Sequence, residues 1–332
     1  MIIDNLFDQV LVEPVKQGAD HLFIVSGYAT ATMTSHHIET IKKNLRKQVH
    51  ISLIVGMCPY DGLSLSNHKA FQQLASADYS SNFECSYIVQ PPPVHSKSYA
   101  WFRGKTPVCG FVGSANYTQN AFSNNQREML VHDDPIRGFA YFQSLVSDTI
   151  YCTHHEVENY VEVYRDTYYA RRKKERLERE GLQLITSRRP DLQGLPGIRI
   201  SLLDKKGGLP QRSGLNWGQR PEYRRDPNQA YIKLSSIVYK TDFFPPIAVR
   251  FTILTDDNKV LVCTRAQQNG KAIESPSNNS LIGEYFRYRL GVPSGNSVRK
   301  QDLINYGRSD VDFYKIDEET YFMDFSVSAS GG

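Results

Sequence analysis

Residues 94–101 read VHSKSYAW and residues 109–116 read CGFVGSAN, and these two stretches decide the fold of the first half of the chain. On a strand, side chains two positions apart point to the same side, so His95 and Lys97 project together. The second stretch ends in small residues and Asn116 and leads into a short helical stretch, where backbone N–H groups can approach an anion. The two strands therefore predict a pocket in which an imidazole, an ammonium and an amide meet a phosphate.

Short apolar segments alternate with helical ones on both sides of these stretches. The expected strands are brief runs of β-branched and aromatic residues bounded by turn residues, and they lie at 21–28, 49–57, 85–89, 95–102, 108–112 and 129–132. The expected helices lie at 35–47, 66–75 and 136–150. This alternation is typical of an α/β domain with a mainly buried sheet.

The pattern changes near residue 190, where short strands separated by Gly, Pro, Asn and Asp predict a barrel-like β domain. These strands are expected at 198–203, 230–234, 249–254, 260–264, 311–316 and 321–325. Two polar segments, 209–227 and 265–280, match no strand pattern. Between the halves, residues 157–179 begin with helical periodicity and continue into a run of basic residues, which predicts a long exposed helix. We therefore predict a first domain at 1–164, a basic helical linker at 165–190 and a second domain at 191–332.

Charge and cysteine usage limit the functions that this chain can have. The first 164 residues are acidic on balance, whereas the linker and the second domain are basic. A basic surface suits a polyanion partner, although ordinary solvated surface charge is an open alternative. Five widely spaced cysteines without a C-x-x-C pair predict reduced thiols in a cytoplasm. No signal peptide or apolar membrane span is recognisable, so no membrane partner is expected.

The strings H-S-K at 95–97 and G-S-A-N at 113–116 resemble the phospholipase D superfamily, whose signature is H-x-K followed by G-S-x-N. That signature often continues with an Asp at the position held here by Phe102, and nuclease members often use a later acid instead. Glu128, at the start of the strand expected at 129–132, is the candidate for this role. It could also be an ordinary surface acid.

The resemblance implies a two-step mechanism that requires no metal and no cofactor. One histidine attacks phosphorus to give a phosphohistidine, and a second histidine protonates the leaving oxygen and then activates water. Lys97 and Asn116 would stabilise charge on the phosphate, while Ser114 would serve either the phosphate or the turn. Because the chain has a single H-x-K motif, we expect a homodimer that places two copies of His95 at one site.

The two polar segments of the second domain are rich in side chains that read base edges and phosphates in double-stranded DNA. The candidate DNA-binding residues of the first segment are Arg212, Asn216, Trp217, Gln219, Arg220, Arg224 and Arg225. Those of the second segment are Arg265, Gln267, Gln268, Asn269 and Lys271. The alternative is a pair of solvent-exposed loops without a ligand.

The order of parts resembles the NgoFVII-type restriction endonucleases, supported also by the strings SGLNWGQR at 213–220 and GEYFRYRLG at 283–291. The resemblance implies a pseudobarrel similar to the plant B-three domain, which grips DNA between two arms that we place on the two polar segments. It also implies, for some members, a separate helicase-like subunit that uses ATP. This chain has no G-x-x-x-x-G-K-[ST] string of its own.

Other functions are weighed against a site-specific endonuclease. A non-specific or RNA-cutting nuclease would use the same phosphodiesterase site. A phospholipid-processing phospholipase D is disfavoured by the single H-x-K motif, by Phe102 and by the lack of a membrane-seeking segment. A protein that binds without cutting is disfavoured because His95, Lys97 and Asn116 are all present.

Overall fold

The computed structural model describes residues 1–123, 126–166, 192 and 194–327. The chain divides into two compact units, Met1–Arg165 and Asp166–Gly332, and each is described by itself. The basic helical linker expected at 165–190 lies outside the described residues from position 167 onward, so the domain limits stay a prediction. In the part of the chain that is described, no helix is long and apolar enough to cross a membrane.

The first unit contains a seven-stranded sheet in the order β7-β6-β5-β1-β2-β4-β8. Three strands are parallel, namely β1 (His21–Ser26), β2 (His50–Val55) and β4 (Phe83–Ile88). The others run antiparallel to their neighbours, namely β5 (Lys97–Arg103), β6 (Thr106–Gly113), β7 (Leu130–Asp133) and β8 (Thr149–Tyr151). The central strands are almost wholly buried, as expected for a sheet covered on both faces.

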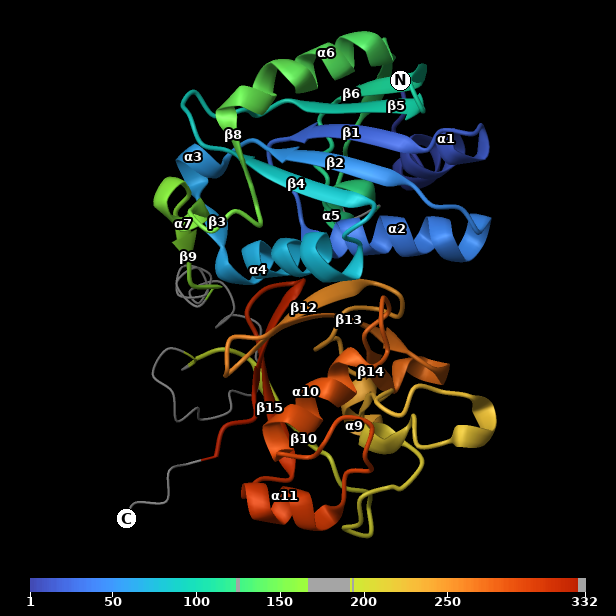
Figure 1. Ribbon diagram of the computed structural model, residues 1–332, viewed down its shortest axis with the longest axis vertical. Coiled ribbons are helices and arrows are strands. Elements are labelled where there is room, and N and C mark those ends of the chain that lie inside the picture. The colour runs from blue at the N-terminus through green and yellow to red at the C-terminus, as the bar shows by residue number, and fades with distance from the viewer. Residues whose placement is uncertain (124–125, 167–191, 193, 328–332) are drawn as a thin grey trace. The chain divides into compact units, whose positions relative to one another are not determined.

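Helices cover both faces of this sheet. On one face α6 (Pro135–Leu145) packs against β1, β5 and β6, and on the other lie α2 (Ala31–Leu45) and α4 (Leu65–Gln73) (Figure 1). The hydroxyl of Thr30 caps α2 by accepting the N–H of Met33, and positions at helical spacing such as His37 and Ile41 are buried.

The expected strands at the site are present, although the one expected from His95 begins at Lys97, and two helix predictions in this unit need correction. The helix expected at 136–150 is too long, because the chain leaves α6 after Leu145 and Ile150 pairs with Tyr87 as part of β8. The helix expected at 157–179 is interrupted, because α7 begins at Val157 and ends at Tyr160 and Val163–Tyr164 form β9; its part from 167 onward lies outside the described residues. The remaining short elements are η1 (Phe7–Val12), α1 (Glu13–Lys16), α3 (Cys58–Asp61), β3 (Leu63–Ser64), η2 (Leu74–Asp78), α5 (Gln119–Phe122), η3 (Val146–Asp148), α7 (Val157–Tyr160) and β9 (Val163–Tyr164).

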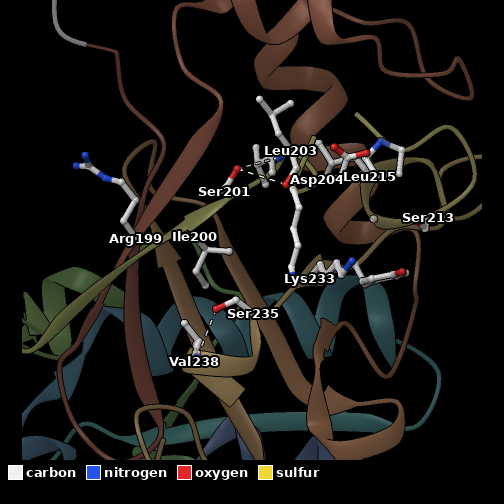
Figure 2. A pocket seen from close by; sticks show the side chains of 15 residues that line it. Arg199, Ile200, Ser201, Leu203, Asp204, Ser213, Leu215, Lys233, Ser235 and Val238 are labelled. Atoms are coloured by element: carbon white, nitrogen blue, oxygen red, sulfur yellow. Dashed lines mark hydrogen bonds between the residues drawn. The ribbon is translucent and has the colours of Figure 1, made fainter. Parts of the chain in front are cut away.

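The second unit also has a seven-stranded sheet, in the order β10-β15-β16-β12-β13-β14-β11. Its strands are β10 (Gly197–Ser201), β11 (Ile232–Lys233), β12 (Arg250–Thr255), β13 (Val260–Ala266), β14 (Ala272–Glu274), β15 (Asp310–Lys315) and β16 (Thr320–Asp324). The sheet curls into a nearly closed barrel, and the described residues of its two end strands, β10 and β11, do not pair with each other. This gap, called the seam below, holds a cavity of about 270 Å³ lined by residues from both strands and from 210–215 (Figure 2).

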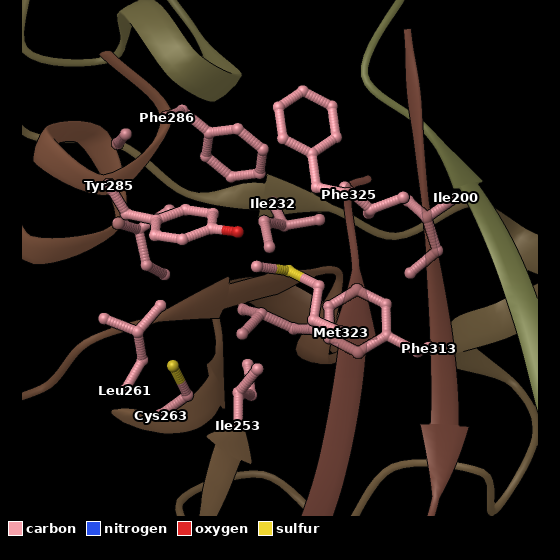
Figure 3. Packing of buried hydrophobic residues seen from close by; sticks show 14 of the residues in the cluster. Ile200, Ile232, Ile253, Leu261, Cys263, Tyr285, Phe286, Phe313, Met323 and Phe325 are labelled. Carbon is pink, nitrogen blue, oxygen red and sulfur yellow. The ribbon is translucent and has the colours of Figure 1, made fainter. Parts of the chain in front are cut away.

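The core of the second unit lies inside the curled sheet. Apolar side chains from β12, β15 and β16 meet Tyr285 and Phe286 there (Figure 3). Those two residues belong to α10 (Leu281–Leu290), which, like α11 (Lys300–Tyr306), lies where the sequence pattern indicated no helix. The segment expected to lack a strand at 265–280 also contains β14. Short helical turns complete the unit, namely η5 (Gly214–Asn216), η6 (Pro221–Tyr223), α9 (Ser236–Tyr239) and η7 (Gln268–Gly270).

Candidate active site and DNA interface

Lys97 is the first residue of β5, and His95 lies two positions before it. The ammonium Nζ of Lys97 is 3.3 Å from Nδ1 and 3.2 Å from Nε2 of His95, and it donates to the backbone carbonyl of His95 at 2.6 Å. The residue between them, Ser96, points elsewhere, with its hydroxyl 2.8 Å from the hydroxyl of Tyr141 on α6. The imidazole and the ammonium therefore lie together at the point where the chain enters β5.

The two side chains differ sharply in exposure. The imidazole of His95 is exposed, whereas Lys97 has only 7% of its surface exposed. Burial lowers the pKa of Lys97, and the nearby carboxylate of Glu128 opposes this change. A charge with little water around it interacts strongly with an anion placed beside it, so Lys97 is suited to binding a phosphate oxygen.

The amide of Asn116 is oriented by the loop that follows β1. Its Oδ1 accepts the backbone N–H of Tyr28 at 3.1 Å and lies 3.5 Å from the hydroxyl of Ser26. A backbone N–H can only donate, so the atom facing it must be the amide oxygen. The Nδ2 group of Asn116 is then the end that can donate to an anion.

Ser114 and Glu128 are linked across the hairpin of β6 and β7. The hydroxyl of Ser114 donates to the Glu128 carboxylate and accepts the N–H of Met129 at 3.0 Å. Pairing of Gly113 with Leu130 holds both residues in register. Within the described residues of one chain, the carboxylate of Glu128 bonds to Ser114 and acts on the pKa of Lys97 through its charge.

Two small residues of the site carry no motif and were missed from the sequence. A side-chain carbon added at Gly27 would lie 3.2 Å from Cδ2 of His95 and 3.4 Å from Oδ1 of Asn116, so glycine leaves room for both side chains. Ser26 accepts the N–H of Tyr117 at 2.9 Å and pairs with Lys97 across β1 and β5. Ser26 is the last residue of an apolar strand and Gly27 follows it, and this position at a strand end is the sequence feature that could have identified both. Among the described residues, no group of three or more His, Cys, Asp or Glu could hold a metal ion.

The two polar segments of the second unit flank the same end of its sheet. The first is joined to β11 through the bond from the N–H of Tyr231 to the carbonyl of Gly214, 3.2 Å long. The second leads from β13 into β14, which pairs with β11. Both candidate DNA-binding segments therefore approach the edge formed by β11 and β14.

Some candidate residues of these segments are available at the surface. The guanidinium of Arg225 lies 4.1 Å from the ring centre of Trp217, and exposed Arg212 pairs with the carboxylate of Glu222. Gln267 is exposed and donates to Glu274 at 3.1 Å. The other candidates that keep at least part of their surface exposed are Arg220, Arg224, Gln268, Asn269 and Lys271.

Three other candidate residues donate to backbone carbonyls of the second unit. Asn216 is fully buried, and its amide bonds to the carbonyls of Pro210 and Val298 and to the N–H of Val298. Arg265 is 8% exposed and donates to four backbone carbonyls, which burial leaves without water. Gln219 is half-buried and donates to two carbonyls. These bonds tie the three side chains to backbone groups of the second unit.

The fold and the site together define a phospholipase D-type nuclease domain followed by a barrel-like DNA-binding domain. Residues 4–159 match the family described as the NgoFVII restriction endonuclease N-terminal PLD domain. Residues 191–317 match the NgoFVII C-terminal B3-like DNA-binding domain. The chain belongs to the NgoFVII restriction endonuclease family.

Solved structures similar to this chain match over less than half of it. NucT from Helicobacter pylori is 15% identical over 45% of this chain and 96% of its own, with a TM-score of 0.32. The phospholipase D family member Nuc from Salmonella typhimurium is 15% identical over 43% of this chain and 88% of its own, with a TM-score of 0.32. Polyphosphate kinase from Porphyromonas gingivalis is 15% identical, covering 45% of this chain and 23% of the kinase, with a TM-score of 0.28. No curated protein sequence matches the chain.

Proposed function

We propose that this chain is a sequence-specific endonuclease that hydrolyses DNA phosphodiester bonds through His95, without a metal ion. The observation that carries the proposal is the contact between the exposed imidazole of His95 and the buried ammonium of Lys97, 3.2–3.3 Å apart. The oriented amide of Asn116 adds a second donor for the same phosphate. Membership of a restriction endonuclease family with a DNA-binding domain supports DNA as the substrate.

The chemistry has two balanced steps. A ring nitrogen of His95 attacks phosphorus, the P–O bond to one strand breaks, and a second histidine gives its proton to the leaving oxygen. Water then attacks the phosphohistidine, the second histidine takes its proton, and the P–N bond breaks with its electron pair returning to His95. Lys97 and Asn116 stabilise the non-bridging oxygens throughout.

The second histidine is His95 of another copy in a homodimer. Twofold symmetry brings one site of each subunit to the same phosphate. The edge strand β7 begins next to Glu128, and its neighbourhood exposes Met129 by 47% and Val131 by 38%. On the outer side of β7 the backbone of Ile2 pairs with Leu130, and the exposed apolar side chains beside this pair favour association with a second copy.

The metal question has a direct test. The isolated chain, free of any ATPase partner and of ATP, is incubated with plasmid DNA in excess EDTA, and the cut ends are sequenced. We expect cutting at one sequence to persist. Loss of cutting that magnesium restores would overturn the metal-free mechanism, and random ends would overturn sequence specificity. Hydrolysis of phospholipid vesicles in place of DNA would overturn the choice of substrate.

The shared site has its own test. Wild-type chain is mixed with increasing amounts of His95→Ala chain under conditions where labelled subunits exchange. Activity should fall as the square of the wild-type fraction, because a mixed dimer has one histidine at the site. A linear fall would show that each chain works alone.

DNA recognition is assigned to the surface residues of the two polar segments, with Arg225 held against Trp217 by a cation–π contact. The full-length His95→Ala chain should bind the duplex that wild type cuts at least about 10³-fold more tightly than unrelated duplexes. Equal affinity for all duplexes would remove this part of the proposal.

A further inference from the structure

The residue that follows Gly27, Tyr28, touches the candidate active site in two ways. Its backbone N–H donates to Oδ1 of Asn116 at 3.1 Å. Its ring meets the ring of His95 edge to face, with centres 6.0 Å apart and planes at 82°. One residue outside both sequence motifs therefore contacts the imidazole and the amide that the reaction would use.

Tyr28 is itself anchored on a separate element. Its hydroxyl donates to the carboxylate of Asp61, the last residue of α3. On the other side, Ala29 forms a bridge with Tyr117, directly after Asn116. The ring of Tyr28 is thus tied at its hydroxyl end and along its backbone, although 41% of the residue is exposed.

The exposed imidazole of His95 needs such a support. Lys97 contacts the ring at both nitrogens, and the backbone at Gly27 approaches it at Cδ2. An ammonium close to both nitrogens does not decide which of them faces the substrate. A rigid ring packed against the imidazole does restrict its rotation, and a nucleophile must point at phosphorus for its attack to be efficient.

We propose that Tyr28, held by Asp61, is a positioning residue that fixes the rotamer of His95 and the amide of Asn116 together. The inference rests on the proposed function and adds a determinant of its rate. The ring of Tyr28 acts on the nucleophile, and its backbone acts on the phosphate-binding amide. A change at Tyr28 or Asp61 should therefore slow the chemical step without weakening DNA binding.

The test compares Tyr28→Ala, Tyr28→Phe and Asp61→Ala in the full-length chain, measuring single-turnover cleavage of the cognate duplex and its binding separately. Loss of alignment should lower the cleavage rate of Tyr28→Ala by about 10- to 100-fold, with affinity within about twofold of wild type. Tyr28→Phe keeps the ring and loses only its bond to Asp61, so its rate should lie between those of Tyr28→Ala and wild type, about 2- to 5-fold below wild type. Asp61→Ala, which frees the hydroxyl from the other side, should match Tyr28→Phe rather than Tyr28→Ala.

The matched control is Tyr60→Ala, because Tyr60 precedes Asp61 on the same helix and is 78% exposed. It should cut like wild type. A Tyr28→Ala rate equal to that of Tyr60→Ala would overturn the inference. So would a Tyr28→Ala chain that melts at a lower temperature, if the cleavage rate of Tyr28→Phe were as low as that of Tyr28→Ala. If Tyr28→Ala fails to fold, the cleavage rates of Asp61→Ala and Tyr28→Phe decide. Wild-type rates in both variants would show that the bond between Tyr28 and Asp61 does not position His95. Failure of wild type to cut would count against the proposed function instead.

Discussion

The candidate active site and the two polar segments of the second unit are both rich in polar side chains, but those side chains are held differently. At the site, His95 and Lys97 lie just before and at the start of β5, Asn116 follows β6, and the registers between β1, β5 and β6 bring them together. In the segments, neighbouring residues differ in burial. Asn216 is buried, whereas the ring of Trp217 beside it contacts the guanidinium of Arg225.

The difference shows what a strand contributes that a loop does not. The alternation of a strand places a side chain from its position alone, so a motif on a strand end predicts a site. The position of a side chain in a loop depends on which nearby backbone groups lack a hydrogen-bond partner, and the residue type alone does not reveal which groups these are. Four expected outcomes test this contrast.

The largest effect is expected at the nucleophile. His95→Ala should lower cutting by at least about 10³-fold, because the covalent intermediate can no longer form. Affinity for the cognate duplex, measured by gel shift, should be unchanged, since the side chain is exposed and remote in sequence from both polar segments. Weakened binding together with lost cutting would mean that the first unit also supplies recognition.

The second-largest effect is expected at Asn216, the buried residue of the first polar segment. Asn216→Ala leaves the N–H and carbonyl of Val298 without their partner inside the second unit. The free energy of unfolding of that unit should fall by about 2–4 kcal/mol, measured by hydrogen exchange of residues 197–327. The exposed pair offers a comparison, because Arg212→Ala should cost at most about 1 kcal/mol. Equal losses would show that burial does not separate these residues.

Acid should destabilise the first unit more than the second, because all nine histidines lie in the first 165 residues. Burial lowers the pKa of His37 to about 3 and that of His21 to about 4, from an ordinary value of 6.5. Below pH 6.5 the unfolded unit binds protons that the folded unit cannot, so its stability falls as the pH drops toward these values. The slope is up to about 1.4 kcal/mol per pH unit for each histidine.

The chain has two tryptophans, one in each unit, which makes this measurable. In Trp217→Phe the buried Trp101 reports urea unfolding of the first unit, which should weaken between pH 7.5 and pH 5. His37→Gln in the same background should reduce the dependence on pH. An unchanged slope would show that the buried ring of His37 is not the acid-sensitive group.

The smallest effect is expected at surface residues of the segments. Arg220→Ala and Lys271→Ala should each weaken cognate binding by about 1–3 kcal/mol, through lost phosphate or base contacts. Their melting temperatures should stay at the wild-type value. Lys300→Ala, at an exposed lysine on α11, is the control and should bind normally. If all three variants bind alike, the two segments are not the recognition surface.

Much of the first unit could be predicted from the sequence, because its strands are apolar and its motifs stand at strand ends. The support from Ser26, Gly27 and Tyr28 could not, since it depends on β1 lying beside β5, a contact far apart in sequence. In the second unit, helix α10 was not predicted from the sequence, because its buried face includes the charged residue Arg287. That guanidinium donates to backbone carbonyls, so a charged residue occupies a position where an apolar pattern is expected.

The seam between β10 and β11 has a consequence for how recognition could change over time. The chain between these two strands, residues 202–231, contains the first polar segment and returns to a sheet edge that no ladder closes. An insertion or deletion there shifts no strand against its neighbour, whereas the same change inside a closed barrel would break a register. Under the proposed function, exchanging the exposed residues of this segment would change the target sequence, while the buried Asn216 and the sheet stay in place.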